Sequence, residues 1–258
     1  MRVFRAVVVA APTISLCAPL ASAAPGSPTT GSLGSSLSNS PAEDATGEAR
    51  LGTLKDENLD QVRQLLQERD VEPSTIERLV DKTKAGFLLD ADNPDMEPIS
   101  TETDENARRV VERQTFADGS VAIVEKEGPK QRNDGGNVIA PADIGGCHIY
   151  VHQDWYRHDN CLISYNGINF SYSFRADYSA ARFTGVAGVI RRVFAPVVHR
   201  SIGANPTSNN VYILREWQDG NISAEAAQTI QFQPWGGWWS WSAHLRLHVL
   251  NNTAWTST

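Results

Sequence analysis

The stretch PWGGWWSWSAHLRLHV, residues 234–249, carries four tryptophans and then alternates strictly between apolar and polar residues. An alternation with a period of two is typical of a β-strand that buries one of its faces. The face that we expect to be buried consists of Trp239, Trp241, Ala243, Leu245, Leu247 and Val249. A register shifted by one residue would bury His244 and Arg246 instead, so Trp239 and Trp241 are predicted to belong to the core.

Four aromatic residues outside this buried face are candidates for contact with a ligand. Trp235 precedes the Gly236-Gly237 turn, and Trp238 lies on the polar face of the expected strand. Trp155 and Tyr156 stand together in a second polar stretch. A site that grips a glycan or a surface needs exposed planar rings, so we predict that Trp235, Trp238, Trp155 and Tyr156 contact the ligand.

The strand pattern extends over the C-terminal half of the chain. In INFSYSFRADY, residues 168–178, aromatic and polar residues alternate almost without fault, which predicts a half-buried strand. Further strands are expected at 148–155, 161–166, 186–201 with a break at Pro196, 211–218 and 224–233. Short strands with turn-rich joints predict a mainly β fold, with an antiparallel β-sandwich or small barrel over residues 142–258.

Residues 24–141 differ in composition from this β-domain. They hold 13 basic and 23 acidic residues, residues 142–258 hold 8 and 7, and every Trp and Tyr lies in the second part. A segment so acidic and so poor in rings cannot bury much apolar surface. We therefore expect a flexible Ser/Gly/Pro-rich tail at 24–54 and an acidic region of short elements at 55–141.

A short α-helical hairpin and a β-hairpin are predicted within the acidic region. The spacing of apolar residues indicates helices at 55–70 and 74–86, the second with Ser74 as N-cap, Glu77 as its capping-box partner and Gly86 at its end. The β-hairpin is expected at 108–127. Its two β-rich runs flank Asp118-Gly119, a pair suited to the positive φ angles of a type I′ turn.

The first residues are typical of a secretory signal peptide. Arg2 and Arg5 precede an apolar run, and Ala21-Ser22-Ala23 has the small-x-small pattern of a cleavage point, so we expect residues 1–23 to be removed. No later run is apolar enough to form a transmembrane span, which predicts a secreted, extracellular protein. In an oxidising compartment Cys147 and Cys161 are predicted to form a disulfide that closes the β-domain.

The sequence predicts no catalytic residue, no cofactor and no metal site. The segment HIYVHQDWYRHDN, residues 148–160, is rich in His and Asp, but residues four apart in a strand lie about 13 Å from each other, too far to share one zinc ion. Asp177 and Glu216 could face each other across a groove as a glycosidase pair, although solvated strand carboxylates are the simpler interpretation. The net charge of −7 and the lack of a basic patch argue against a nucleic-acid partner.

The layout of the chain resembles that of uncharacterised secreted proteins of actinobacterial type. The resemblance covers residues 55–258 and is carried by ADGSVAIVEKE, by GCHIYV followed by NCLISYNGINFSYSFRADY, and by SAHLRLHVLNNTAW. It implies no established activity and no catalytic residues. Between the two cysteines such proteins often have a stretch rich in Gly and Ser, whereas this chain has HIYVHQDWYRHDN.

These observations predict a secreted, non-catalytic binding protein. Its partner is expected to be a cell-wall glycan, a cell surface or another protein, and the oligomeric state is left open. Two alternatives stay open beside it. In one, the acidic half is a pro-segment that masks a secreted effector, membrane-active or antagonistic. In the other, the β-domain is a glycan hydrolase.

Overall fold

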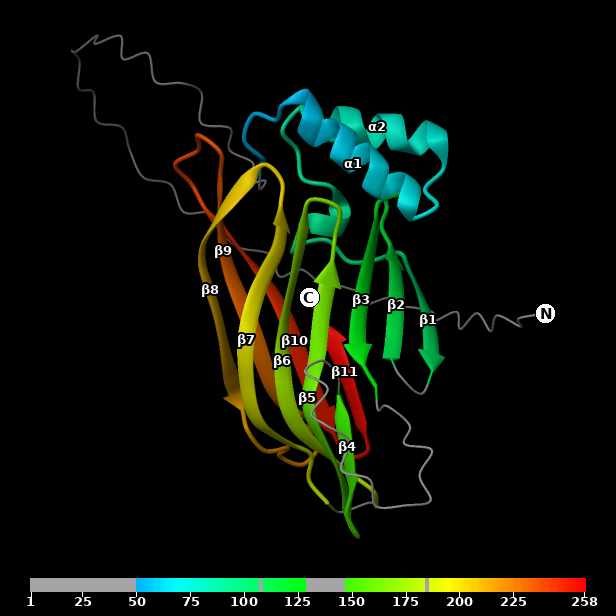
Figure 1. Cartoon of the computed structure of the whole chain (residues 1–258), viewed down its shortest axis with the longest axis vertical. Helices are drawn as coiled ribbons and strands as arrows, with labels where there is room; N and C mark the ends of the chain where they lie inside the picture. Colours follow the sequence, from blue (N-terminus) through cyan, green and yellow to red (C-terminus); the bar gives the residue numbers. More distant parts are fainter. Residues whose placement is uncertain (1–49, 107–108, 129–146, 184–185) are drawn as a thin grey trace, which may run out of the picture. The chain divides into compact units, whose positions relative to one another are not determined.

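A computed structural model describes residues 50–106, 109–128, 147–183 and 186–258 of the chain. The predicted signal peptide at 1–23 and most of the predicted tail at 24–54 lie outside these residues. Within them, two antiparallel β-sheets are preceded by two short helices, which confirms the mainly β fold class (Figure 1). The described residues belong to one compact unit.

The helices and the strands of the larger sheet come first along the chain. Their bounds are α1 Asp56–Glu68, α2 Pro73–Lys84, the short 3₁₀ helix η1 Asp90–Asp92, β1 Ser100–Asn106, β2 Arg109–Thr115, β3 Val121–Glu127, β4 His148–Val151, β5 Trp155–Asn166, β6 Phe170–Ala181 and β7 Val189–Ser201. The larger sheet has the order β1-β2-β3-β5-β6-β7, with β4 beside β5.

The smaller sheet is made of the last four strands. They are β8 Ala204–Arg215, β9 Ala224–Pro234, β10 Trp241–Leu250 and β11 Thr253–Ser257, in the order β11-β10-β9-β8. The inner faces of the two sheets share one core, in which the Phe170 and Phe232 rings lie 4.5 Å apart. Among the described strands the sheets stay separate, so the fold is the sandwich and not the small barrel.

The register predicted for the tryptophan-rich strand is confirmed. Ala243, Leu245, Leu247 and Val249 are buried, and the residues between them are not. The Trp241 ring packs against the core, and Trp239, half-buried, lies 5.3 Å from it. The alternation in β10 therefore sets which side of the smaller sheet faces the core.

Several strand limits differ from those predicted. β7 continues through Pro196, so the predicted break is wrong. Proline is tolerated there because β7 is an edge strand and has a bulge at this point, with Ala195 at φ 50°. β8 begins at Ala204, well before residue 211. β1 and β11 were not predicted, because β1 has no apolar residue and β11 has only five residues.

The predicted β-hairpin forms β2 and β3, with a different turn. Phe116 N–H donates to Ser120 O, and only Gly119 of the loop 117–119 has a positive φ, 84°. This is a three-residue loop with glycine in the left-handed region, not a type I′ turn. The hairpin also pairs with the C-terminal strands, since β3 lies beside β5 from Ile123↔Asn166 to Lys126↔Ile163.

The two helices lie at one end of the sandwich (Figure 1). α2 begins at Pro73 with Glu72 as N-cap, so Ser74 is inside the helix and the predicted capping box is not formed. Gly86 ends the helix as predicted, with φ 86°. The apolar faces of α1 and α2 form a second core with three residues of the sheet end, namely Val121, Ile168 and Ile202.

Charged side chains attach the helices to the sheet. The guanidinium of Arg69, at the end of α1, donates to the carbonyls of Val121 and Gly167. The buried Asp92 carboxylate accepts the N–H groups of Asn169 and Phe170 at 2.8 and 3.2 Å. Burial raises the pKa of Asp92 to about 6, although these hydrogen bonds and the nearby guanidinium groups oppose the shift.

Candidate functional site

The structure places the four predicted ligand contacts in two separate pairs. Trp235 and Trp238 lie in the loop between β9 and β10, and Trp155 and Tyr156 lie at the start of β5. The first pair is near the start of β6 and the second near its end, since Tyr156 pairs with Ala180. From Phe170 to Ala180 a strand spans roughly 33 Å. The rings therefore do not form one platform.

The rings of each pair differ in how much surface they offer. Trp238 is 92% exposed. Trp235 is half-buried, and its indole N–H donates to the Asn205 side chain at 3.1 Å. At the other end His152 stacks on Trp155 with centroids 3.7 Å apart, and the Arg182 guanidinium lies over Tyr156. Trp238 is thus the one predicted contact with an uncovered ring.

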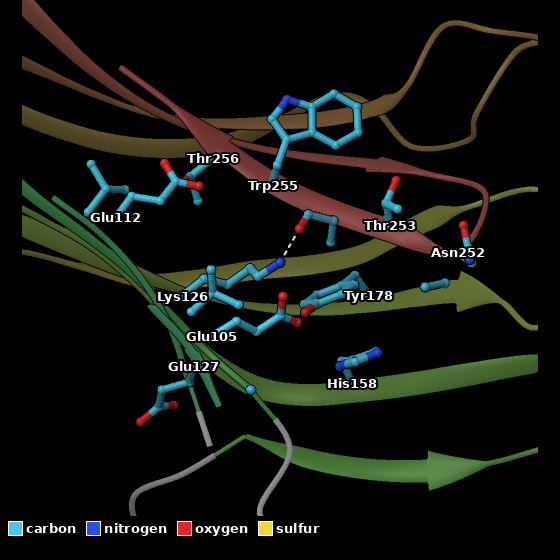
Figure 2. Close-up of a pocket in the computed structure, with 15 residues that line it drawn as sticks. Glu105, Glu112, Lys126, Glu127, His158, Tyr178, Asn252, Thr253, Trp255 and Thr256 are labelled. Carbon is cyan, nitrogen blue, oxygen red and sulfur yellow. Dashed lines mark hydrogen bonds between the residues drawn. The ribbon is translucent and has the colours of Figure 1, made fainter. Parts of the chain in front are cut away.

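A cavity of about 340 Å³ opens beside β11, between residues 252–256 and the inner side of β1, β2, β3, β5 and β6. We call it the β11 cleft (Figure 2). Its charged lining residues are Glu105, Glu112, Lys126 and Glu127, three acidic groups and one basic group. The β11 cleft is the candidate functional site, because it combines accessible volume with charged groups from strands far apart in the sequence.

The pairing of β1, β2 and β3 puts the charges side by side. Val110 lies opposite both Glu105 and Lys126, and Glu112 is two residues along from Val110 on the same side of β2. The Lys126 ammonium donates to the Ala254 carbonyl of β11, as the dashed line in Figure 2 shows. Glu127 accepts the Leu162 N–H at 3.0 Å and lies 3.7 Å from the Arg175 guanidinium.

Burial in the β11 cleft shifts the proton affinity of its charged groups. It lowers the pKa of the Lys126 ammonium, and the charges of Glu105 and Glu112 oppose the shift. It raises the pKa of the Glu112 carboxyl, against the charge of Lys126. Glu105 and Glu112 thus lie near one cation, which is already bonded to a backbone carbonyl.

The floor of the β11 cleft contains a neutral aromatic pair. The His158 and Tyr178 rings stack with centroids 4.4 Å apart. Burial, helped by the charge of Lys126, lowers the pKa of His158 to about 4, and burial raises the pKa of the Tyr178 hydroxyl. His158 Nδ1 is buried and has no hydrogen-bond partner among the residues that the structure describes. The imidazole is therefore neutral at pH 7.

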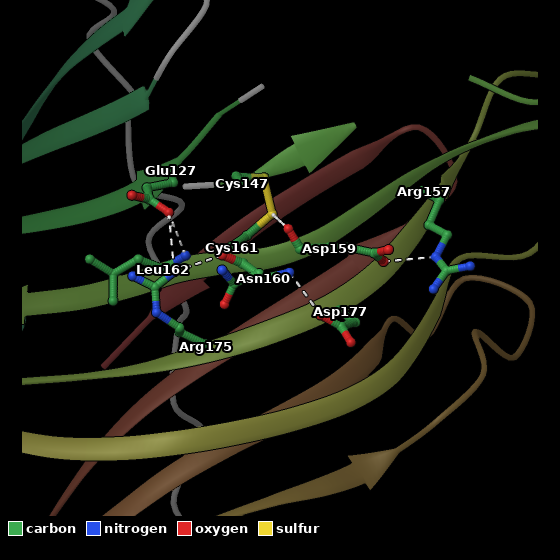
Figure 3. Close-up of a disulfide and its surroundings, with 9 residues drawn as sticks. All are labelled: Glu127, Cys147, Arg157, Asp159, Asn160, Cys161, Leu162, Arg175 and Asp177. Atoms are coloured by element: carbon green, nitrogen blue, oxygen red, sulfur yellow. Dashed lines mark hydrogen bonds and ion pairs between the residues drawn. A yellow bond between two sulfur atoms is a disulfide. The ribbon is translucent and has the colours of Figure 1, made fainter. Parts of the chain in front are cut away.

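The predicted disulfide forms between Cys147 and Cys161 (Figure 3), and it lies next to His158 of the β11 cleft. It joins the residue before β4 to β5 and closes a loop with a sequence separation of 14. A loop of this size contributes about 3 kcal/mol in the chain-entropy model. The two sulfurs and one His158 nitrogen lie within 4.8 Å of one another. With the sulfurs joined, no thiolate is present to bind a metal ion there.

The two carboxylates considered for glycosidic chemistry have different surroundings. Asp177 is buried and accepts the Asn160 N–H at 2.8 Å (Figure 3). It also pairs with the Arg192 guanidinium at 2.8 Å. Glu216 is exposed beyond the end of β8. The fixed contacts of Asp177 are those of a structural ion pair on the outer face of the sheet.

Sequence reasoning missed the residues of the β11 cleft. One signal was present: in VAIVEKE, residues 121–127, Lys126 continues the row of Ala122 and Val124, which are both buried. A lysine in an inward-facing row has to meet an acceptor inside the sandwich. The acceptor, Ala254 O, belongs to a strand that was not predicted.

Comparisons of this chain with protein-family models, curated proteins and solved structures gave no match. In the part of the chain that the structure describes, no helix is long and apolar enough to span a membrane.

Proposed function

We propose that the protein is an exported binding protein that holds a positively charged group of its ligand in the β11 cleft. One observation carries the proposal. Among the described lining residues, Glu105, Glu112 and Lys126 together have a net charge of −1, because Glu127 pairs with the Arg175 guanidinium, and Lys126 already donates to Ala254 O. The carboxylates of Glu105 and Glu112 therefore remain to meet an incoming cation.

An ammonium or guanidinium group suits this arrangement. Its N–H donors would form charge-assisted hydrogen bonds with Glu105 and Glu112, which are about twice as strong as bonds between neutral groups. Burial of Glu112 disfavours its charged form, and a bound cation would reverse that effect. We therefore expect binding to weaken as the pH falls and Glu112 takes up a proton.

Export and the choice of partner follow from the sequence. The predicted leader at 1–23 directs the chain out of the cell, and the Cys147–Cys161 disulfide is consistent with an oxidising destination. The sequence leaves three classes of partner open: a wall glycan, a cell surface or another protein. The acidic groups of the cleft favour those partners that present amino or guanidinium groups.

Calorimetric titration with three probes tests the proposal: a chitosan hexamer, tetralysine and uncharged cellohexaose. We expect at least one cationic probe to bind the wild type and the neutral sugar not to bind. The double variant Glu105→Gln/Glu112→Gln should lose this binding. Equal binding by that variant would refute the cleft as the binding site.

A matched control distinguishes an effect of the cleft from an effect of the overall negative charge. Glu102→Gln/Asp104→Asn also removes two negative charges, but these residues alternate with Glu105 along β1 and so lie on the other side of the strand. This variant should bind like the wild type. A third variant, Trp235→Ala/Trp238→Ala, tests the predicted ring contacts. Loss of binding in that variant alone would place the ligand at the β9–β10 loop.

A further inference from the structure

The two sheets differ in width beside β11. Among the described strands, the smaller sheet ends at β11, whose partner is β10. β11 packs against β3 and β6, and the larger sheet continues beyond β3 with β2 and β1 (Figure 1). The β11 cleft lies next to β11 over these strands. It therefore occupies the position of a fifth strand of the smaller sheet.

The inner rows of β1 and β2 have the composition of an uncovered surface. On β1 this row consists of Thr101, Thr103 and Glu105, all exposed. On β2 the row consists of Val110 and Glu112, both half-buried, and of Gln114, which is buried. Farther along the same inner face, β3, β5 and β6 supply the aliphatic and aromatic core. Hydrogen-bonding and charged groups thus replace the apolar ones where none of the described strands faces the larger sheet.

The free edge of β11 presents backbone groups toward the cleft. β10 and β11 are joined by the turn at 251–252, with Leu250 opposite Thr253. In such a two-residue hairpin, the two residues that flank the turn form two hydrogen bonds with each other, N–H to C=O in both directions. Farther along the strands, hydrogen-bonded pairs alternate with pairs that are not hydrogen-bonded to each other. Ala254 and Thr256 belong to non-bonded pairs, so their N–H and C=O groups point away from β10.

Lys126 satisfies one of these groups. Its ammonium donates to the Ala254 carbonyl, and among the described residues the Ala254 N–H and both backbone groups of Thr256 are left for another partner. An inward-pointing lysine is also a common protection of an edge strand against uncontrolled pairing. A carbonyl oxygen can accept two hydrogen bonds, so a peptide strand can pair with Ala254 and Thr256 while Lys126 keeps its bond to Ala254 O.

We infer that β11 accepts an extended peptide as a fifth strand, with a lysine or arginine side chain of the peptide directed at Glu105 and Glu112. This inference rests on the proposed function and names its ligand class. The peptide backbone would bond Ala254 and Thr256, as in other cases of β-strand addition. Alternate side chains would point to the larger sheet, about 10 Å away, a gap that an extended basic side chain can bridge.

A phage-displayed library of random nonapeptides, selected on the full chain, provides the test. We expect the enriched peptides to alternate in polarity and to share a basic residue at one inward position. Synthetic copies should bind the wild type, and replacing their basic residue by glutamate should weaken binding about tenfold or more. Enrichment without a shared basic residue, or no enrichment, would overturn the inference.

Two changes to the backbone test strand pairing itself. Thr256→Pro removes an N–H that faces the cleft, and proline is tolerated on edge strands. This variant should lose the selected peptides while its unfolding midpoint stays unchanged. N-methylation of alternate peptide residues removes the same bonds from the ligand side, so the test holds even if Thr256→Pro misfolds. Peptides that bind equally well after N-methylation would refute strand addition.

Failure of this inference is distinguishable from failure of the proposed function. If chitosan binds and Glu105→Gln/Glu112→Gln abolishes that binding, but no peptide is selected, the cleft binds cations and strand addition is wrong. If peptides bind Glu105→Gln/Glu112→Gln as well as the wild type, the acidic groups do not select the ligand. Binding lost only in Trp235→Ala/Trp238→Ala would refute both.

Discussion

At the scale of single residues, two buried groups titrate in opposite senses. The pKa of His158 is lowered to about 4 by burial and by the charge of Lys126, and that of Asp92 is raised to about 6 by burial. Between pH 6.5 and 4 the unfolded chain binds a proton at His158 that the folded chain does not. The free energy of unfolding therefore falls as the pH falls. Asp92 has the opposite effect, because the folded chain protonates it first.

The variant His158→Phe isolates the histidine, since it keeps a ring against Tyr178 and leaves Asp92 unchanged. We expect the stability of the variant relative to the wild type to rise as the pH is lowered from 6.5 to 4, by about 3 kcal/mol at most. Urea unfolding at several pH values measures this difference. A difference that does not change with pH would show that the folded chain protonates His158 normally.

At the scale of elements, the β2–β3 turn depends on one glycine. Gly119 has φ 84°, and a Cβ there would lie 2.8 Å from the Thr75 methyl group of α2. Gly119→Ala therefore combines backbone strain with a clash, and we expect a loss of about 1–3 kcal/mol in unfolding free energy. Gly220, with φ 55° and open space around it, is the matched control. Equal losses in both alanine variants would show that the contact with α2 is unimportant.

The elements also show what the sequence could predict. β10 was predictable because Leu245 and Leu247 alternate with His244 and Arg246, so the two faces differ in polarity. β1, with the sequence STETDEN, has the same polarity on both faces and gives no such signal. The β11 cleft could not be predicted, because Glu112 and Lys126 meet β11 only through the order of strands, which no local pattern contains.

At the scale of the whole molecule, the acidic and the aromatic parts of the chain share one sheet. β3 pairs with β5, and Ala122 and Val124 belong to the same core as Phe170 and Phe174. This arrangement bears on the alternative in which the acidic half is a removable pro-segment. Release would require breaking the β3–β5 pairing as well as the peptide bond.

Insertion of a protease recognition sequence between Gly128 and Cys147 tests this point. After cleavage we expect the two fragments to stay together in size-exclusion chromatography and to separate only in denaturant. Both cysteines lie in the second fragment, so the disulfide cannot hold the two together. Fragments that separate in native buffer would favour the pro-segment alternative.

The β3–β5 pairing has a consequence for how the protein is made. Synthesis begins at the N-terminus, so β1, β2 and β3 leave the ribosome before their neighbour β5 has been translated. Until then the nascent chain has to keep one side of β3 unoccupied, although such edges readily pair with other chains. Chaperones that hold back folding should therefore matter more for this chain than for one whose neighbouring strands are translated consecutively.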